Sequence, residues 1–325
     1  GGSAARRRTC TPGAALSVDQ RPRSAGRKNG LKVERKIAGN RSSRTGFLLS
    51  LPYWAWFAFF MAWPLLFSLV LVFHEWDIYT PMRWVGLGNF VRLFQDDLFW
   101  QAILNTLYFL VIHIPLQIGL ALLFAVLLNE KIRARGFFRA AYFMPVVVSG
   151  IVISLLWQQL FSYENGILNL LLARAGLARI PWLTSPEWAM PSVALMATWK
   201  NVGLYIILFL AGLQNIPAWL YEAAGIDGAT AWQKFRHSTL PMLSPAVIMV
   251  LILSTIGGFS LFIEPYVLTG GGPMNRTLSA MLYIYKQAFY FNRMGYAATL
   301  GFFFAFIILA VVLVQRKVVE QEALE

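Results

Sequence analysis

Long runs of apolar residues without acidic or basic side chains recur along the chain. A helix needs about 20 such residues to cross a bilayer core of about 30 Å, and six segments reach that length with at most one Asp, Glu, Lys or Arg in each. The runs do not alternate apolar and polar residues as the strands of a membrane barrel do. They predict an all-α membrane protein with about six transmembrane helices. The predicted spans are residues 47–73, 101–128, 140–163, 188–213, 238–263 and 294–314.

The segments outside these spans form two tails and a set of loops. Residues 1–46 contain 12 Lys or Arg and only 2 Asp or Glu, and they account for +10 of the net charge of +13. Because this tail is rich in Gly, Pro, Ser and Arg, we expect a mostly disordered cytoplasmic segment that lies beside anionic lipid rather than nucleic acid. Residues 47–315 form the predicted transmembrane domain, and residues 316–325 a short cytoplasmic tail.

The composition narrows the class of protein. Charged residues make up 13% of the chain, whereas a soluble domain usually contains about a quarter. The single cysteine, Cys10, excludes a disulfide framework, and no cluster of Cys and His suggests a metal site. The sequence has no Gly-Lys-Ser/Thr phosphate loop and no HExxH or GxSxG motif. We therefore expect neither ATP hydrolysis by this chain nor an intramembrane enzyme.

Basic residues indicate the orientation of the spans. If the N-terminus is cytoplasmic, the inner segments hold 20 Lys or Arg and the outer loops hold 7. The ratio is still 13 to 7 when the tail contributes only the five basic residues nearest the first span. Because cytoplasmic loops carry the excess of basic residues, we expect both termini in the cytoplasm. The outer loops are then residues 74–100, 161–188 and 264–293.

The inner loop between the fourth and fifth spans, residues 217–241, has the clearest local pattern. Pro217 suits the first turn of a helix, and Gly228 permits a turn with positive φ. A second short helix can follow over residues 229–237. One stripe of the first helix consists of Leu220, Ala223, Ala224 and Asp227. The sequence therefore predicts a helix–turn–helix with an exposed apolar and small-residue surface, and such a surface needs a partner.

The same loop resembles a known motif. Its residues Glu222-Ala223-Ala224, then Gly228 after three residues, then Ser238-Thr239-Leu240-Pro241 after nine more, resemble the EAA loop of ATP-binding-cassette (ABC) importer permeases. The family pattern is EAA, three residues, Gly, nine residues and Ile-x-Leu-Pro, so only Ser238 departs from it.

Four further segments resemble the maltose-type carbohydrate permeases of this family. They are residues 85–90, 199–201, 211–217 and 267–273. The resemblance extends over about residues 47–315 and leaves out the N-terminal tail.

The resemblance implies a function and partners. The chain would be the permease subunit of an ABC importer in the bacterial cytoplasmic (inner) membrane, and it would move a sugar or oligosaccharide delivered by a periplasmic or lipid-anchored solute-binding protein. Two separate ATPase subunits would bind ATP and Mg, so no cofactor or metal is implied in this chain. A second, related but non-identical permease would complete the pathway. The motif assigns ATPase coupling to Glu222, Ala223, Ala224, Asp227, Gly228, Leu240 and Pro241.

Lys200 is the charged residue inside a predicted span. A lysine there costs at least about 2.5–3.5 kcal/mol, so we expect it to face a wet cavity or a partner, with a structural role slightly favoured over substrate contact. Its neighbours could stack on sugar rings and donate hydrogen bonds, and small residues of the fifth span either pack helices or line a path. The candidate substrate path is Trp199, Lys200, Asn201, Tyr205, Ser254 and Ser260. For His113 we expect a hydrogen bond between helices.

Two alternatives stay open at this point. A basic residue in the cavity also suits an acidic oligosaccharide or a sugar phosphate carried by the same mechanism. An ion-coupled secondary transporter is the alternative of a different class, but such proteins use mid-membrane acidic residues and internal repeats. No repeat is visible, and no Asp or Glu lies deep in a span, since Glu264 is at the outer edge of the fifth. The Gly-rich segment 268–273 is expected to be a flexible outer turn.

Overall fold

The computed structural model describes residues 46–129 and 135–322 of the 325-residue chain. Residues 1–45, 130–134 and 323–325 lie outside the described residues, and so does the predicted disorder of the N-terminal tail. Within them, the regular secondary structure is helical apart from two short strands. The chain divides into two compact units, Gly1–Pro64 and Leu65–Glu325.

The first predicted span is a helix from Gly46 to Leu71. A π-helical turn, η1 (Ala58–Ala62), interrupts its regular α-helical bonding, and α2 (Trp63–Leu71) continues it. No side chain of η1 is buried. An apolar helix of this kind is suited to lipid, because its backbone hydrogen bonds are satisfied within the helix.

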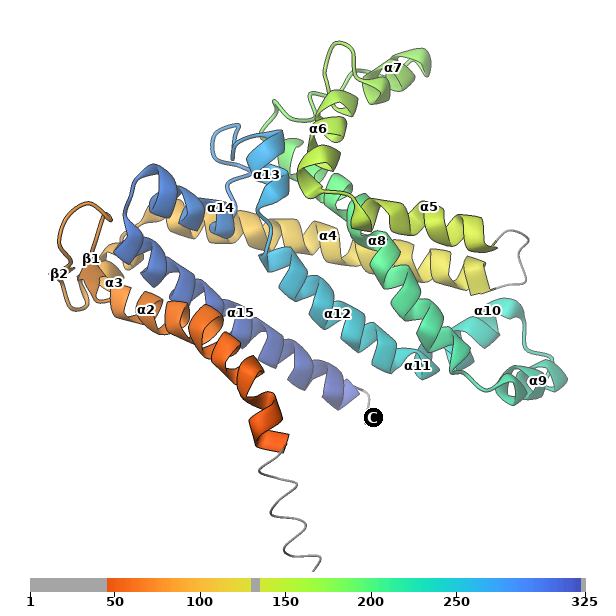
Figure 1. Cartoon of the computed structure of the whole chain (residues 1–325). Coiled ribbons are helices and arrows are strands. Elements are labelled where there is room, and N and C mark those ends of the chain that lie inside the picture. The colour runs from red at the N-terminus through yellow and green to blue at the C-terminus, as the bar shows by residue number, and fades with distance from the viewer. Residues whose placement is uncertain (1–45, 130–134, 323–325) are drawn as a thin grey trace, which may run out of the picture. The chain divides into compact units, whose positions relative to one another are not determined.

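Four long helices dominate the second unit: α4 (Asp97–Asn129), α8 (Ala189–Gln214), α12 (Ser244–Phe259) and α15 (Met294–Glu322) (Figure 1). The first, second and fourth run in one general direction, and α12 returns in the opposite direction (Figure 1). α4 packs along α8, while α12 packs against α4, α8 and α15. With the first span, and with α12 continued as far as Leu268, these helices provide five segments long and apolar enough to cross a membrane among the described residues.

The third predicted span is broken in two. The sequence predicts one helix over 140–163, but the structure has α5 (Arg135–Val147) and α6 (Gly150–Leu160), which are bent by 100° from each other. Pro145 removes a backbone donor near the end of α5, and Ser149 takes the extended conformation, with φ −52° and ψ 131°. With this pair counted as one broken span, the described residues contain six.

The other predicted spans occur as helices with shifted ends. α4 begins at Asp97 instead of residue 101. α12 begins at Ser244 instead of residue 238, because a π-helical turn, η2 (Phe235–Thr239), and the one-turn helix α11 (Leu240–Met242) precede it. α15 continues beyond residue 314 and includes most of the predicted tail 316–325.

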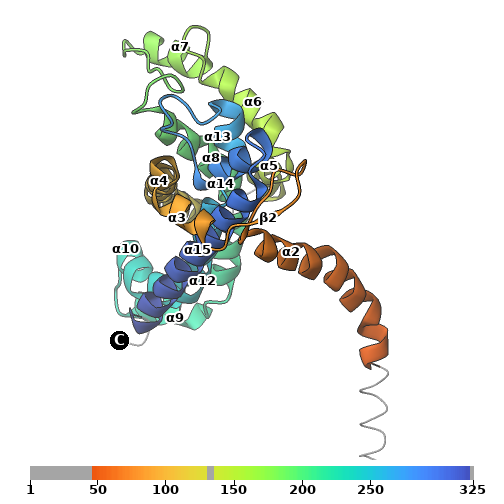
Figure 2. The same ribbon diagram turned by 90° about the vertical axis from the view of Figure 1, so that its left-hand side faces the viewer.

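Short elements connect the long helices. β1 (His74–Glu75) pairs antiparallel with β2 (Arg83–Trp84), with His74 opposite Trp84. α14 packs against α4 and α15, whereas α7 and α9 lie at opposite ends of this unit (Figure 2). The short helical elements are α3 (Gly88–Phe94), α7 (Ile167–Arg174), α9 (Ala218–Ile226), α10 (Ala231–Lys234), α13 (Ile263–Leu268), α14 (Ala280–Tyr285) and the π-helical turn η3 (Lys286–Tyr290).

Two apolar clusters form the core of the second unit. One includes the fully buried rings of Phe99 and Phe259, and the other includes Phe209. A glycine permits close packing of α8 on α5: a Cβ at Gly203 would come within 2.1 Å of the carbonyl oxygen of Tyr142. The backbones of α5 and α8 therefore approach as closely as those of membrane helices that meet at small residues.

Candidate functional site

The loop after α8 folds into a hairpin of short helices, residues 218–239, here named the 218–239 hairpin. Pro217 precedes α9 in an extended conformation, and Asp227 ends that helix. Gly228 then turns the chain with φ +74°, a conformation that glycine adopts without steric cost. The predicted helix–turn–helix, with its positive-φ glycine, is confirmed.

A capping box that was not predicted from the sequence starts the second helix of the hairpin. The backbone N–H of Gln233 donates to Thr230 Oγ1 at 3.3 Å, and the backbone N–H of Thr230 donates to Gln233 Oε1 at 2.7 Å. The Thr-x-x-Gln spacing of these residues is the signal that could have revealed it.

Further contacts stabilise the hairpin. The hydroxyls of Tyr221 and Thr239 lie 3.0 Å apart and join the first arm to the second. Within the second arm, the rings of Trp232 and Phe235 stack with centroids 5.6 Å apart. These contacts fix the shape of the hairpin while its outer surface stays free.

The outer surface of the hairpin is apolar and exposed. No side chain of α9 or α10 is buried. At the tip, Ile226 is 88% exposed, and Trp219 and Trp232 are each about two-thirds exposed, at 65% and 66%. Exposed apolar patches of this kind mark surfaces for a partner, so the predicted exposed surface is confirmed.

The motif residues of the loop occupy two places. Glu222, Ala223, Asp227 and Gly228 are exposed on the hairpin, and Ala224 is half-buried. Leu240 and Pro241 follow it in α11 and are also exposed. Within the described part of the chain, the Glu222 carboxylate makes no ion pair.

A polar cavity of about 250 Å³ lies among α4, α8, α12 and α13. Five of the six candidate path residues line it: Lys200, Asn201, Tyr205, Ser254 and Ser260. The sixth, Trp199, does not. Its ring packs on Trp157, with centroids 5.5 Å apart, and it lines a separate apolar cavity of about 440 Å³. Successive helix residues point about 100° apart, which explains why neighbours of Lys200 divide between two cavities.

Lys200 faces both the cavity and a charged partner. Its Nζ lies 3.0 Å from Glu264 Oε1, and the two side chains are only 15% and 11% exposed. Glu264, predicted at the outer edge of the fifth span, lies in the first turn of α13 and is buried against α8. The backbone at Gly150 also lies close to this site, because a Cβ there would be 2.9 Å from Lys200 Nζ.

Two further polar residues of α4 belong to this region. His113 Nδ1 lies 2.8 Å from Thr198 Oγ1, which confirms the predicted hydrogen bond between helices, and the ring also lines the cavity. Gln117, which was not among the residues predicted from the sequence, accepts a 2.8 Å hydrogen bond from Ser254 Oγ. The Nε2 group of Gln117 is buried without a hydrogen-bond partner among the described residues.

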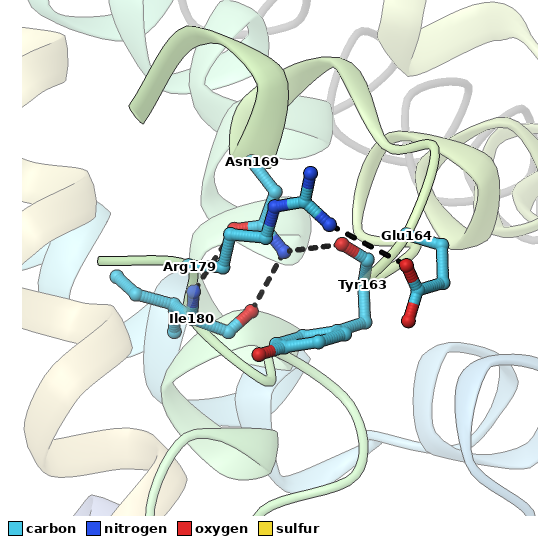
Figure 3. Close-up of polar contacts among 5 residues, drawn as sticks. All are labelled: Tyr163, Glu164, Asn169, Arg179 and Ile180. Atoms are coloured by element: carbon cyan, nitrogen blue, oxygen red, sulfur yellow. Dashed lines mark hydrogen bonds and ion pairs between the residues drawn. The ribbon is translucent and has the colours of Figure 1, made fainter. Parts of the chain in front are cut away.

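The segment between α6 and α8, residues 161–188, is here named the 161–188 excursion, and one side chain organises it (Figure 3). The fully buried Asn169 donates from Nδ2 to the carbonyl oxygens of Tyr163 and Ile180. Its Oδ1 accepts from the backbone N–H of Ile180 and from Trp182 Nε1. The sequence predicted only a loop here, because these bonds join residues up to 13 positions apart.

Hydrogen bonds from side chains hold the Gly-rich segment 268–273 in place. Lys286 Nζ donates to the carbonyl oxygen of Gly270 at 2.7 Å, and burial lowers the pKa of Lys286 from its ordinary value. The hydroxyls of Thr269 and Thr277 lie 2.6 Å apart. The expected flexible turn is therefore a hydrogen-bonded one, and it does not line the polar cavity.

Comparisons with known proteins identify the class of molecule. Residues 99–321 match the family described as "Binding-protein-dependent transport system inner membrane component". The lactose transport system permease protein LacF of Rhizobium radiobacter is 41% identical over 266 residues, which cover 79% of this chain and 88% of the relative. The trehalose/maltose transport system permease protein MalF of Thermococcus litoralis is 35% identical, with 78% of this chain and 85% of the relative covered.

A solved structure has the same fold. It is the crystal structure of a bacterial alginate ABC transporter in complex with an alginate pentasaccharide-bound periplasmic protein. One of its chains superposes with a TM-score of 0.76 at 26% identity, covering 89% of this chain and 98% of that one. Together with the membrane-spanning helices, the family match shows that this multi-pass inner-membrane chain is a transport component and not an enzyme. The chain belongs to the family of binding-protein-dependent transport system inner membrane components.

Proposed function

We propose that the chain is the permease subunit of an ABC importer that moves a sugar or oligosaccharide into the cytoplasm. The observation that carries this proposal is the 218–239 hairpin, which combines the EAA spacing with an exposed apolar tip at Ile226. The sugar transport systems to which its relatives belong support the substrate class.

The 218–239 hairpin is the contact with one of two ATPase subunits, which bind ATP and Mg. Its exposed Trp219, Ile226 and Trp232 would lose contact with water in a cleft of the ATPase. Glu222 is exposed beside them and pairs with a basic residue of the partner. Because the loss of one member of a buried charge pair costs about 2–5 kcal/mol, this pair ties the movement of the ATPase to the helices.

The polar cavity forms part of the sugar path. Its lining combines the rings of Phe109 and Tyr205 with the amide of Asn201 and the hydroxyls of Ser254 and Ser260. Rings that stack and groups that both donate and accept hydrogen bonds suit a sugar. At about 250 Å³ the cavity is smaller than the about 300–1,000 Å³ of typical ligand pockets. A second, non-identical permease subunit supplies the opposite wall.

The proposed topology puts both termini and the 218–239 hairpin in the cytoplasm. The excess of basic residues on that side supports this orientation. The 161–188 excursion, at the other end of the second unit (Figure 2), then faces the periplasmic or lipid-anchored solute-binding protein that delivers the sugar. That partner shifts the transporter toward an outward-open state by binding this state more tightly than the others.

Purification of the assembled transporter tests the ATPase contact. Each of the variants Glu222→Lys and Ile226→Asp should lose the ATPase subunits from the purified complex and should no longer support sugar uptake into proteoliposomes. Glu164→Lys is the matched control, because Glu164 is an exposed acidic residue of the 161–188 excursion, and this variant should keep its ATPase subunits. Retention of both ATPase subunits and of uptake by the hairpin variants would reject the proposal.

A further inference from the structure

We propose that the ion pair between Lys200 and Glu264 makes the polar cavity selective for uncharged sugars over uronates. The inference rests on the proposed function of the cavity as a sugar path and names the class of sugar. Lys200 alone suits an acidic substrate, whereas the ion pair in the structure points the other way.

The charges in the cavity compensate each other. Among its lining residues, Lys200 and Glu264 carry the formal charges, and their Nζ and Oε1 atoms are 3.0 Å apart. The other polar lining groups are those of His113, Asn201, Tyr205, Ser254 and Ser260. The cavity therefore offers hydrogen bonds without a free positive charge.

The pair is largely removed from water, which makes it hard to exchange. The two side chains are 15% and 11% exposed, and a buried charge that loses its partner is strongly destabilised. The carboxylate of a uronate would either displace Glu264 from Lys200 or lie beside Glu264. The first arrangement leaves one buried carboxylate unpaired, and the second places two like charges together.

The position of Lys200 makes the ion pair still harder to exchange. The backbone at Gly150, where α6 begins after the bend, approaches so closely that a Cβ would lie 2.9 Å from Nζ. Glu264 is likewise fixed, since it is buried in the first turn of α13. A neutral sugar needs no such exchange, because its hydroxyls can both donate to and accept from Asn201 and the serines.

Two matched probes test the inference. Methyl β-galactoside and methyl β-galactosiduronate, the methyl glycoside of galacturonate, differ only in the replacement of a CH2OH group by a carboxylate. Their dissociation constants are measured with the assembled transporter in nanodiscs, without the solute-binding protein, so that its own selectivity plays no part. The wild type should bind the galactoside at least about tenfold more tightly, because a like charge beside Glu264 is costly.

Variants of the pair separate charge from shape. Glu264→Gln keeps the size of the side chain and frees the Lys200 ammonium, so the preference should fall at least about tenfold toward the galacturonate. Glu264→Asp retains the charge and should keep the wild-type preference. If Glu264→Gln does not assemble, the double exchange Lys200→Glu with Glu264→Lys preserves both the pair and the neutrality, and the preference should persist.

The outcomes are distinct. Equal binding of the two probes by the wild type, tighter binding of the galacturonate, or an unchanged ratio in Glu264→Gln would overturn the charge-selectivity inference but leave the sugar path standing. Loss of the preference in the double exchange would overturn it as well. If the wild type binds neither probe, the sugar path itself is wrong, and the inference falls with it.

Discussion

Two excursions leave the helices of the second unit, and they are built in opposite ways. The 161–188 excursion closes on itself, because the fully buried Asn169 satisfies four polar groups and the ring of Trp182 packs on Phe161, 5.5 Å between centroids. The 218–239 hairpin buries no side chain of α9 or α10, and Ile226 at its tip is 88% exposed. The first needs no partner to hold its shape. The second fixes its own backbone and leaves its apolar surface exposed.

The largest effect is expected from Asn169→Leu in the 161–188 excursion. It removes four hydrogen bonds and leaves partly buried backbone groups such as the N–H of Ile180 unpaired, so the local free energy of opening should fall by about 3–5 kcal/mol at about 1 kcal/mol per bond. Hydrogen–deuterium exchange should become much faster across residues 161–188. The exposed Leu171 provides the control, since Leu171→Ala should leave the exchange slow. Unchanged exchange in Asn169→Leu would contradict the self-contained structure described for the excursion.

In the 218–239 hairpin, the largest effect should come from Gly228→Val. The turn requires φ +74°, and a β-branched residue held in this region costs about 1–3 kcal/mol. The hairpin should open, seen as faster exchange over residues 218–239. Gly225→Ala is the matched control, because Gly225 is helical and a Cβ there meets only the flexible end of Lys234. If Gly228→Val exchanges as slowly as the wild type, the turn does not depend on glycine.

A smaller effect is expected from the capping box. Thr230→Ala removes the side-chain acceptor for the N–H of Gln233 and should destabilise α10 by about 1 kcal/mol. Thr230→Ser keeps the acceptor and should behave like the wild type. The exchange rates of α10 distinguish the two variants, and equal rates would show that the cap contributes nothing.

The smallest effect is expected from Arg179→Ala in the 161–188 excursion. The ion pair with Glu164 is 3.4 Å long, and its side chains are 38% and 73% exposed. Exposed pairs contribute about 0–1 kcal/mol and are screened by salt. Exchange across the excursion should therefore stay close to that of the wild type at low and high salt. Much faster exchange in Arg179→Ala would show that this ion pair, and not Asn169, is the main stabilising contact of the excursion.

The sequence predicted most of the fold because lipid imposes a simple pattern. Long apolar runs with at most one charge had to be spanning helices, and the ends of the helices differ from the predicted ends by up to eight residues, at the end of α15. The break between α5 and α6 was not predictable in the same way. Pro115 lies inside the unbroken helix α4, while Pro145 lies just before the bend. Whether a proline ends a helix depends on the packing of the neighbouring helices, and the run of apolar residues does not reveal that packing.

The candidate site, like the fold, could be predicted from the sequence only in part. The EAA spacing, the turn at Gly228 and the exposed surface are local features, so the sequence was sufficient for them. The partner of Lys200 was not found, because Glu264 is 64 positions away and reaches it only through the packing of α13 on α8. Trp199 was placed in the path because it is adjacent to Lys200 in sequence, although adjacent residues on a helix face different neighbours.

The central claim, that the 218–239 hairpin is covered by an ATPase subunit, can be tested by the accessibility of one thiol. In a Cys10→Ser background, the chain has no other cysteine, and Ile226→Cys places a thiol at the exposed tip. A membrane-impermeant maleimide should label this position in inside-out vesicles that contain the permeases alone, and labelling should be lost when the ATPase subunits are present. Leu177→Cys in the 161–188 excursion should give the same labelling of detergent-solubilised protein with and without them. Labelling of Ile226→Cys that is undiminished in the assembled transporter, or that occurs only from the outside, would contradict the claim.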